Sequence, residues 1–236
     1  MSRGVFIAGT DTGVGKTRVS VALLQALQQR DLKAVGMKPV ATGAVPLPAG
    51  AESLRRFSAN GLINEDVAAI AAFCPPECES SLINPYCFEL PVSPHIAARR
   101  AGVSIEPERI AAAYEALAQQ CAAVVVEGTG GWLAPIGERA TMAEIAVRLR
   151  LPVVLVVGVR LGCLNHALLS QQAILATGLP LAGWIGSVLD PAMLCLQDNL
   201  AALSARLQAP RLALLAHNPR SDGDAAALAA ASGALF

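Results

Sequence analysis

The stretch Gly9-Thr10-Asp11-Thr12-Gly13-Val14-Gly15-Lys16-Thr17 decides the fold that we expect for this chain. It follows the apolar run Val5-Phe6-Ile7-Ala8 and precedes a segment whose apolar residues recur at helical spacing up to about Arg30. Its glycines let backbone N–H groups turn toward an anion, and the N-terminus of the following helix adds a positive partial charge. A strand, a glycine loop and a helix in this order predict a phosphate-binding loop, and therefore the binding of a nucleoside triphosphate.

Two side chains of the loop carry further chemistry. Lys16 is placed to reach the β- and γ-phosphates, and the hydroxyl of Thr17 is placed to hold Mg²⁺. Five residues separate Gly9 from Gly15, where the usual loop has four, and Thr10 stands at the expected glycine position. An ordinary glycine turn is the alternative, but the strand and the helix on either side favour phosphate binding.

The composition limits the class of protein. The chain has 236 residues with 18 Lys and Arg against 18 Asp and Glu, so nothing indicates a nucleic-acid partner or a basic membrane-facing surface. The longest apolar run, 151–159, is about half of the length that a membrane-spanning helix needs, and the N-terminus lacks the features of a signal peptide. We therefore expect one cytoplasmic α/β domain over residues 1–236, with no membrane partner. The six cysteines are expected to be reduced thiols, although the spacing of Cys74 and Cys78 would also suit a metal pair.

Apolar runs alternate with amphipathic segments along the chain. The run at 122–126 is nearly continuous, which is typical of a strand buried on both faces of a parallel sheet. The alternation predicts a mostly parallel sheet with helices on both faces, in a P-loop NTPase-like α/β fold. The expected strands are 34–37, 122–126, 153–159, 181–188 and 212–216, and the expected helices after the first are 67–73, 107–121, 163–176 and 192–207.

Three segments give weaker signals. Residues 44–64 are expected to form a long surface connection with about one helical turn, and residues 75–93 to be irregular. The tail from Asn218 is polar and then alanine-rich.

Polar candidates follow several of the expected strands. Lys38, Glu127, Arg160 and Ser187 fall at carboxyl ends, which meet at one edge of a parallel sheet. A carboxylate in this position, such as that of Glu127, is typical of phosphoryl-transfer sites that engage Mg²⁺. A lone lysine at a strand end is usually solvated, but the topological proximity of Lys38 to the phosphate loop favours a functional role.

Two expected helix starts leave alternatives open. Glu65 and Asp66 either complement the helix dipole or supply a metal carboxylate, and the sequence does not separate the two. Gly162 and Asn165 either cap a helix or belong to a site for a substrate carboxylate. His95 is more readily explained as a structural hydrogen-bonding residue than as a catalyst.

Several stretches of sequence combine into a specific set of motifs. They are the loop from Gly9, Lys38-Pro39-Val40-Ala41-Thr42-Gly43, Asn84-Pro85-Tyr86, Ser93-Pro94-His95, Val126-Glu127-Gly128-Thr129-Gly130-Gly131-Trp132 and Gly158-Val159-Arg160-Leu161-Gly162-Cys163-Leu164-Asn165-His166. In order and combination these motifs resemble the dethiobiotin synthetase family, in which the five-residue spacing in the loop is usual. Related amidoligases and partitioning ATPases share the phosphate loop, but the partitioning enzymes carry a second lysine where this chain has Asp11.

The resemblance implies a reaction and its partners. 7,8-Diaminononanoate is carboxylated by CO₂ or bicarbonate to a carbamate, ATP phosphorylates the carbamate to a carbamic-phosphoric anhydride, and the second amine closes the ring of dethiobiotin. Lys16 and Lys38 would be the catalytic residues, because each stage gathers negative charge on oxygen. The alternatives are another P-loop ATP-dependent ligase or amidoligase and, with less support, a nucleotide-switched partitioning-type ATPase.

The same resemblance implies site residues in a homodimer. Asp66 is preferred over Glu65 only because Asp66-Val67-Ala68 matches the family's Asp-Ala-Leu pattern. The implied metal ligands are Thr17, Asp66 and Glu127. The implied ATP-binding residues are Gly13, Val14, Gly15, Lys16, Thr17, Arg18, Asp66, Glu127, Gly128, Thr129, Gly130 and Ser187. The implied substrate-binding residues are Thr12, Thr42, Leu161, Gly162, Cys163 and Asn165, with 161–165 acting across the dimer interface.

Several positions depart from the family pattern. Gly13 fills a loop position that is often acidic, and the connection before Asp66 is longer than usual. Ser187-Val188 stands where an Asn commonly reads adenine, and Ala213-Leu214-Leu215-Ala216 replaces a Gly-x-Ile-Pro segment. We expect weakened discrimination in favour of ATP as a consequence.

Overall fold

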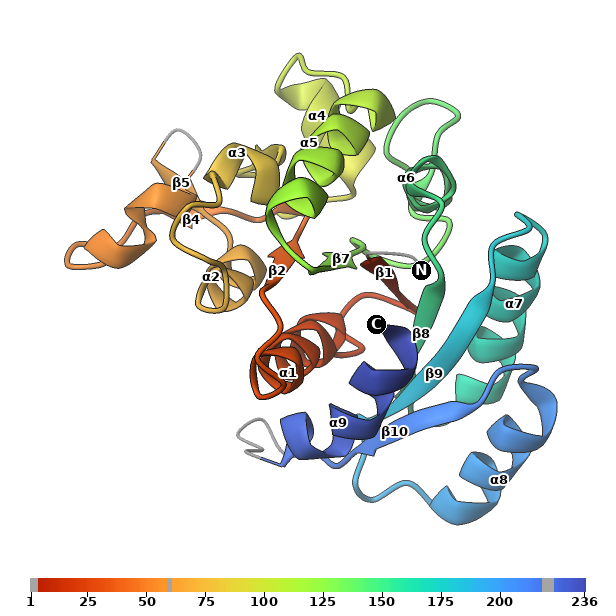
Figure 1. Ribbon diagram of the computed structural model, residues 1–236. Helices are drawn as coiled ribbons and strands as arrows, with labels where there is room; N and C mark the ends of the chain where they lie inside the picture. The colour runs from red at the N-terminus through yellow and green to blue at the C-terminus, as the bar shows by residue number, and fades with distance from the viewer. Residues whose placement is uncertain (1–3, 59–60, 218–222) are drawn as a thin grey trace.

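Six parallel strands form the central sheet of the computed structural model, which describes residues 4–58, 61–217 and 223–236. Their order across the sheet is β10-β9-β8-β1-β7-β2 (Figure 1), so the mostly parallel sheet expected from the sequence is confirmed. The strands are β1 (Gly4–Gly9), β2 (Ala34–Met37), β7 (Ala123–Glu127), β8 (Val153–Val159), β9 (Leu181–Val188) and β10 (Arg211–Leu215).

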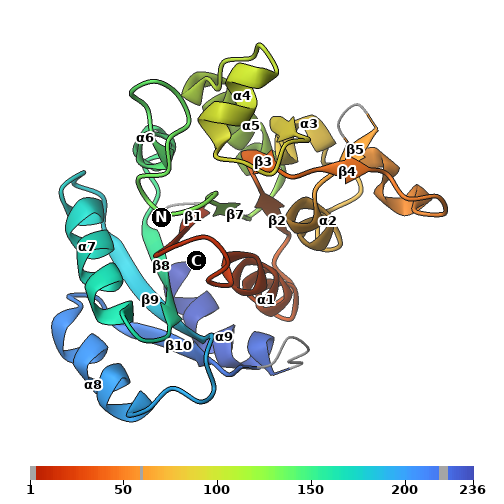
Figure 2. The same cartoon turned by 180° about the vertical axis from the view of Figure 1, so that it is seen from behind.

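Helices cover both faces of this sheet (Figures 1 and 2). Helices α1 (Lys16–Gln28), α2 (Glu65–Ala71) and α9 (Asp224–Leu235) pack on one face, with α1 in contact with both α2 and α9. On the other face lie α5 (Pro107–Gln120), α7 (Cys163–Leu175) and α8 (Leu196–Arg206), and α6 (Met142–Leu149) packs against α5. Because both faces are covered, every residue of β1, β7 and β8 is buried, as their continuous apolar runs predict.

The register of the strands fixes which side chains meet at the carboxyl edge. Met37 at the end of β2 lies opposite Val126, and Ile7 of β1 lies opposite Glu127. Lys38 therefore leaves β2 beside the last residue of β7, and the phosphate loop leaves β1 on the other side of β7. The sheet register alone brings together groups that are far apart in the sequence.

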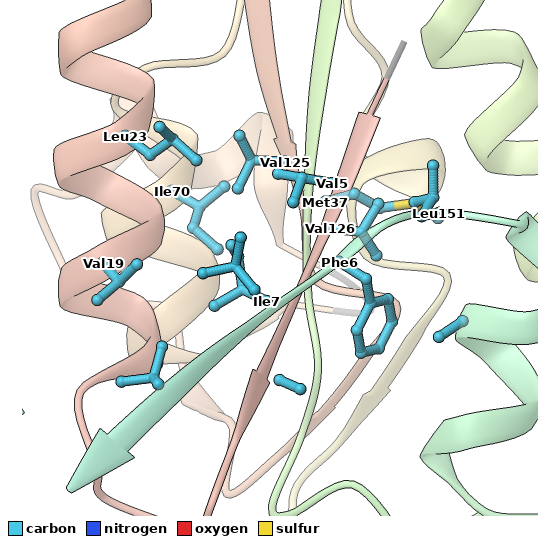
Figure 3. Close-up of a cluster of buried hydrophobic side chains, with 14 of the residues drawn as sticks. Val5, Phe6, Ile7, Val19, Leu23, Met37, Ile70, Val125, Val126 and Leu151 are labelled. Carbon is cyan, nitrogen blue, oxygen red and sulfur yellow. The ribbon is translucent and has the colours of Figure 1, made fainter. Parts of the chain in front are cut away.

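Successive side chains of β1 point to opposite faces of the sheet and pack into the hydrophobic core on each side. Figure 3 shows Ile7 pointing toward Val19 of α1 and Ile70 of α2, while Phe6 points to the opposite side. Gly36 in β2 allows α2 to approach, because a Cβ at this position would lie 2.1 Å from Cγ2 of Ile70. This close packing places the N-terminus of α2, and with it Asp66, against the carboxyl edge of the sheet.

Two segments differ from the sequence-based expectation. Residues 75–93 are not irregular throughout, since they contain α3 (Ser80–Ile83) and β6 (Tyr86–Phe88), which pairs in parallel with β3 (Val40–Thr42). The connection 44–64 contains β4 (Val45–Pro46), η1 (Glu52–Phe57) and β5 (Leu62–Ile63), with β4 and β5 antiparallel; its residues 59–60 lie outside the described residues. These strands are too short to show a period of two in the sequence.

Further helices were missed or placed differently by the sequence analysis. Pro94–Arg100 forms α4, which the expected helices did not include; its Pro94 occupies the first helical position. Helix α6 starts at a capping box between Thr141 and Glu144, and α9 lies within the alanine-rich tail, of which 218–222 are outside the described part. No helix among the described residues combines the length and the apolar character needed to cross a membrane.

Candidate active site

The phosphate-binding loop joins the end of β1 to the start of α1. Gly15 has φ +94°, a conformation that favours glycine, and a Cβ there would lie 2.9 Å from Oγ of Ser187. The ammonium of Lys16 donates to the carbonyl of Asp11 at 2.9 Å. The carboxylate of Asp11 accepts from the backbone N–H of Thr12 at 2.7 Å and from Arg160 at 2.9 Å. The loop is thereby folded back on itself, with the ammonium of Lys16 held over it.

A compact polar cluster lies beside the loop. Lys38 Nζ contacts Asp66 Oδ2 at 2.8 Å and Glu127 Oε1 at 2.6 Å. The hydroxyl of Thr17 lies 2.6 Å from Asp66 Oδ1 and 2.7 Å from the same Glu127 oxygen, and donates to one of them at a time. The side chains of Lys38 and Glu127 are 3% and 0% exposed, so these charges interact in an environment largely free of solvent.

The protonation of the cluster follows from its neighbours. Burial opposes the charged form of Lys38, but Glu127 and Asp66 outweigh it and raise the pKa of this lysine above its ordinary value. Burial, and next the charge of Lys38, lower the pKa of Lys16 to about 8. Burial also opposes ionisation of Asp66, yet Lys38 and then the Thr17 hydroxyl hold the pKa of that carboxyl below its usual range. At neutral pH the two ammonium groups therefore face an ionised Asp66.

One residue that the sequence analysis did not single out supports this geometry. Asn64 is 5% exposed and caps α2 by accepting from the backbone N–H groups of Asp66 and Val67. Its side-chain nitrogen donates to the carbonyl of Thr42 at 2.9 Å. The position of Asp66 and the end of β3 are therefore linked through one amide group. An Asn just before an acidic helix start was the available signal in the sequence.

The oxygens of Thr17, Asp66 and Glu127 fit a magnesium ion. All three are hard oxygen ligands, and Oε2 of Glu127 is buried with no hydrogen-bond partner within the described part of the chain. Among the same described residues, no group of three or more His, Cys, Asp or Glu could hold a metal by itself. Such a site would therefore depend on nucleotide phosphates and water for its remaining ligands, as Mg²⁺ sites commonly do.

A cavity of about 740 Å³ opens over the loop and the cluster. This volume is in the range of small-molecule sites, and the cavity walls combine the two lysines with hydroxyl and backbone groups. Asn64, Glu65, 91–94, Gly131 and Ala134 line it in addition to the expected residues. The expected site residues in its wall are Thr12, Gly13, Gly15, Lys16, Thr17, Lys38, Thr42, Asp66, Glu127, Thr129 and Gly130.

Other expected nucleotide-binding residues lie behind this wall. Val14 is buried, and Gly128 packs so closely on Phe6 that a Cβ would lie 3.1 Å from its ring. Ser187 is 2% exposed beneath Gly15. Arg18 directs its guanidinium to Asp224 of α9 and not to the cavity.

The expected substrate residues at 161–165 also lie outside the cavity wall. Gly162 caps α7 with φ +93°, Cys163 is buried, and Leu161 is 90% exposed. Arg160, the residue before them, reaches the phosphate loop through its ion pair with Asp11. Within one chain, this helix start and the cavity are therefore neighbours rather than one site.

The chain is similar in sequence to known proteins over most of its length. Residues 3–225 match the family described as AAA domain. The chain is 47% identical over 220 residues to the ATP-dependent dethiobiotin synthetase BioD of Aromatoleum aromaticum, with 93% of each chain covered. It is 46% identical over 214 residues to the protein of the same name from Xylella fastidiosa, with 91% of this chain and 90% of the relative covered.

Solved structures show the same fold at low sequence identity. The MinC:MinD cell division protein complex of Aquifex aeolicus matches with a TM-score of 0.55 and 15% identity, covering 98% of this chain and 94% of the other. A ParA family ATPase from Chlorobium tepidum TLS matches with a TM-score of 0.53 and 17% identity, covering 100% and 92%. These likenesses confirm a P-loop NTPase-like fold.

Proposed function

Because the chain belongs to the family of ATP-dependent dethiobiotin synthetases, we propose that it uses ATP to convert 7,8-diaminononanoate and CO₂ into dethiobiotin. The observation that carries the proposal is the position of Lys38. Its ammonium sits between Asp66 and Glu127 at 2.8 and 2.6 Å, in the wall of the cavity that also contains Lys16 and Thr42. A nucleotide-switched protein would need the phosphate loop, but not a second buried lysine beside a substrate-sized space.

The proposed reaction proceeds in three steps. One amine attacks the carbon of CO₂ and loses a proton, giving a carbamate. A carbamate oxygen attacks the γ-phosphorus of ATP and the bond to ADP breaks, giving the carbamic-phosphoric anhydride. The second amine attacks the carbamate carbon and loses a proton, and the C–O bond breaks to release phosphate and the closed ring.

The two lysines act where negative charge gathers. Lys16 binds the β- and γ-phosphates and Lys38 stabilises the carbamate and transferring phosphoryl oxygens, and both groups are preorganised by burial. Thr17, Asp66 and Glu127 would hold Mg²⁺, which when bound neutralises phosphate charge. The hydroxyl groups of Thr12 and Thr42 bind the diamine substrate.

Three expectations stay proposals for this chain. Residues 161–165 of a second copy would bind the substrate's carboxylate, which makes a homodimer part of the proposed enzyme. The cytoplasmic location and the single domain over 1–236 also stay predictions.

The test is phosphate release by the purified protein with ATP, Mg²⁺, bicarbonate and the diamine. We expect release that requires both the diamine and bicarbonate, and that is accompanied by dethiobiotin detected by mass spectrometry. Release without the diamine would favour the nucleotide switch, and release that needs a different amine or carboxylate would favour another ligase. Lys38→Ala should lose turnover and retain ATP binding, and turnover near that of the wild type would exclude the role given to Lys38.

A further inference from the structure

The backbone at Lys38 is held by a segment that lies outside the cavity. The backbone N–H of Lys38 donates to the carbonyl of Ile83 at 2.8 Å, and the side-chain amide of Asn84 donates to the carbonyl of Lys38 at 2.6 Å. The N–H of Tyr86 donates to the carbonyl of Pro39 at 3.1 Å. Residues 83–86 thus bind both peptide groups that flank the Lys38 side chain.

Asn84 occupies the centre of this arrangement. It is 6% exposed, and its amide nitrogen donates both to Lys38 and, at 3.0 Å, to the carbonyl of Tyr86. Its own backbone N–H donates to Ser80 at 2.8 Å, which fixes it to the end of α3. Both donor hydrogens of the amide are therefore used, one on the carbonyl of Lys38 after β2 and one on the carbonyl of Tyr86 in β6.

The local sequence makes this amide hard to replace. Lys38 lies between β2 and β3, and Pro39 has no backbone N–H with which to hold the chain there. Strands β3 and β6 pair over only three residues, from Val40 opposite Tyr86 to Thr42 opposite Phe88. The position of the main chain just before β3 therefore depends on the hydrogen bonds that residues 83–86 make to Lys38 and Pro39.

We propose that Asn84 is a positioning residue for Lys38, holding the main chain so that the ammonium stays between Asp66 and Glu127. The proposal rests on the catalytic role proposed for Lys38. A displacement of about 1 Å at a catalytic group can lower a rate about a hundredfold, so loss of this amide should affect turnover much more than nucleotide binding. The hydrogen bonds of Asn84 within the described part of the chain go to Lys38, Tyr86 and Ser80 and not to the phosphate loop, so the loop should keep its affinity for ATP.

A neighbouring residue provides a matched control. The hydroxyl of Tyr86 accepts from the backbone N–H of Glu106 at 3.0 Å, on the same segment but directed away from Lys38. Tyr86→Phe removes one hydrogen bond of this segment and leaves the ring beside Arg109. This variant therefore shows how turnover changes when the segment loses a hydrogen bond but keeps the side-chain amide of Asn84.

The first measurement compares kcat and the Kd for ATP. We expect Asn84→Ala to lower kcat at least about tenfold with a Kd for ATP within about twofold of the wild type, and Tyr86→Phe to change neither beyond about twofold. If Asn84→Ala fails to fold, Asn84→Ser keeps one donor and should show the same separation to a smaller extent. Equal kcat in a folded Asn84 variant and the wild type would overturn the proposal.

The second measurement does not depend on activity. Each protein is labelled briefly with an amine-acetylating reagent, and the modification of Lys38 relative to that of Lys16 is read by mass spectrometry. The ratio should rise in Asn84→Ala and stay constant in Tyr86→Phe, because only the first releases Lys38 from its burial between carboxylates. An unchanged ratio, or equal increases at both lysines, would show a general loosening and contradict the proposal. Normal turnover in Lys38→Ala would instead refute the proposed function, so the two failures are distinguishable.

Discussion

Arg18 and Asp224 form an ion pair that joins the start of α1 to α9. Arg18 Nε lies 2.5 Å and Nη2 lies 2.8 Å from the two carboxylate oxygens of Asp224, and Nη1 donates to the carbonyl of Ala216 at 2.7 Å. The guanidinium therefore ties the start of α1 to the end of β10 and to α9. We infer that Arg18 anchors the C-terminal helix, although the family resemblance implied ATP binding.

The magnitude of this anchor follows from its burial. The two side chains are 22% and 11% exposed. Solvent-exposed ion pairs contribute less than about 1 kcal/mol to the free energy of unfolding. Removing one partner of a fully buried pair costs about 3–5 kcal/mol. For this intermediate case we expect Arg18→Ala or Asp224→Ala to lower the free energy of unfolding by about 2 kcal/mol, which corresponds to a fall in Tm of about 4–8 °C in a chain of this length.

The assay is a double-mutant cycle followed by thermal unfolding, with ATP affinity measured by calorimetry. The free energy of unfolding of the double variant should be lower than that of the less stable single variant by no more than about 0.5 kcal/mol, because each replacement removes the same ion pair. Arg30→Ala is the control at the same helix interface, since within the described residues Arg30 makes a 3.3 Å hydrogen bond to Ser232 of α9 and no ion pair there. It should lower Tm by less than about 2 °C.

ATP affinity decides between the two roles of Arg18. If the guanidinium acts as an anchor, both single variants should bind ATP with a Kd within about threefold of the wild type. A Kd raised more than about tenfold in Arg18→Ala, with Asp224→Ala unchanged, would refute the reasoning and favour direct contact with the nucleotide.

Three further predictions concern other parts of the molecule. Asn64→Ala should lower the free energy of unfolding by about 1 kcal/mol and weaken Mg²⁺ binding to the ATP complex, because it removes the cap that orients Asp66; chemical denaturation and a Mg²⁺ titration measure both. At pH 8 the exposed Cys195 should react with a disulfide reagent in the native protein. Burial raises the pKa of the Cys121 thiol to about 12, so Cys121 should react only after unfolding, and its modification in the native protein would contradict this prediction. Because Ser187 is buried and has no side-chain amide to offer to a base, turnover with other nucleoside triphosphates should stay within about tenfold of that with ATP. Strict use of ATP in kinetic assays would contradict this prediction.

Much of the sheet could be predicted because its strands are buried on both faces. The strands at 34–37, 153–159 and 181–188 have the bounds that their apolar runs indicated. The convergence of Lys38 and Glu127 on the phosphate loop also followed from the sequence, since carboxyl ends of parallel strands share one edge. The preference for Asp66 over Glu65 agrees with the contacts that Asp66 makes to Thr17 and Lys38.

The remaining features depend on contacts that no local pattern encodes. The pairing of β3 with β6 joins two segments of three residues, too short for a periodic signal. Arg18 and Asp224 are separated by 206 positions, and the alanine-rich segment around Asp224 gave no sign of its partner. The amide of Asn84 reaches Lys38 only because the chain after α3 and the chain after β2 come together in the fold.

The central claim is that Lys38 and the phosphate loop together allow a carbamate oxygen to accept phosphate from ATP. The most direct measurement supplies CO₂ labelled with ¹⁸O, together with the diamine and ATP in unlabelled water, and follows the released phosphate by mass spectrometry before the label exchanges with solvent. The proposed sequence predicts one ¹⁸O atom in each phosphate, because the C–O bond of the carbamate breaks when the ring closes. Phosphate that carries only solvent or ATP oxygen, formed at the same rate as dethiobiotin, would contradict it.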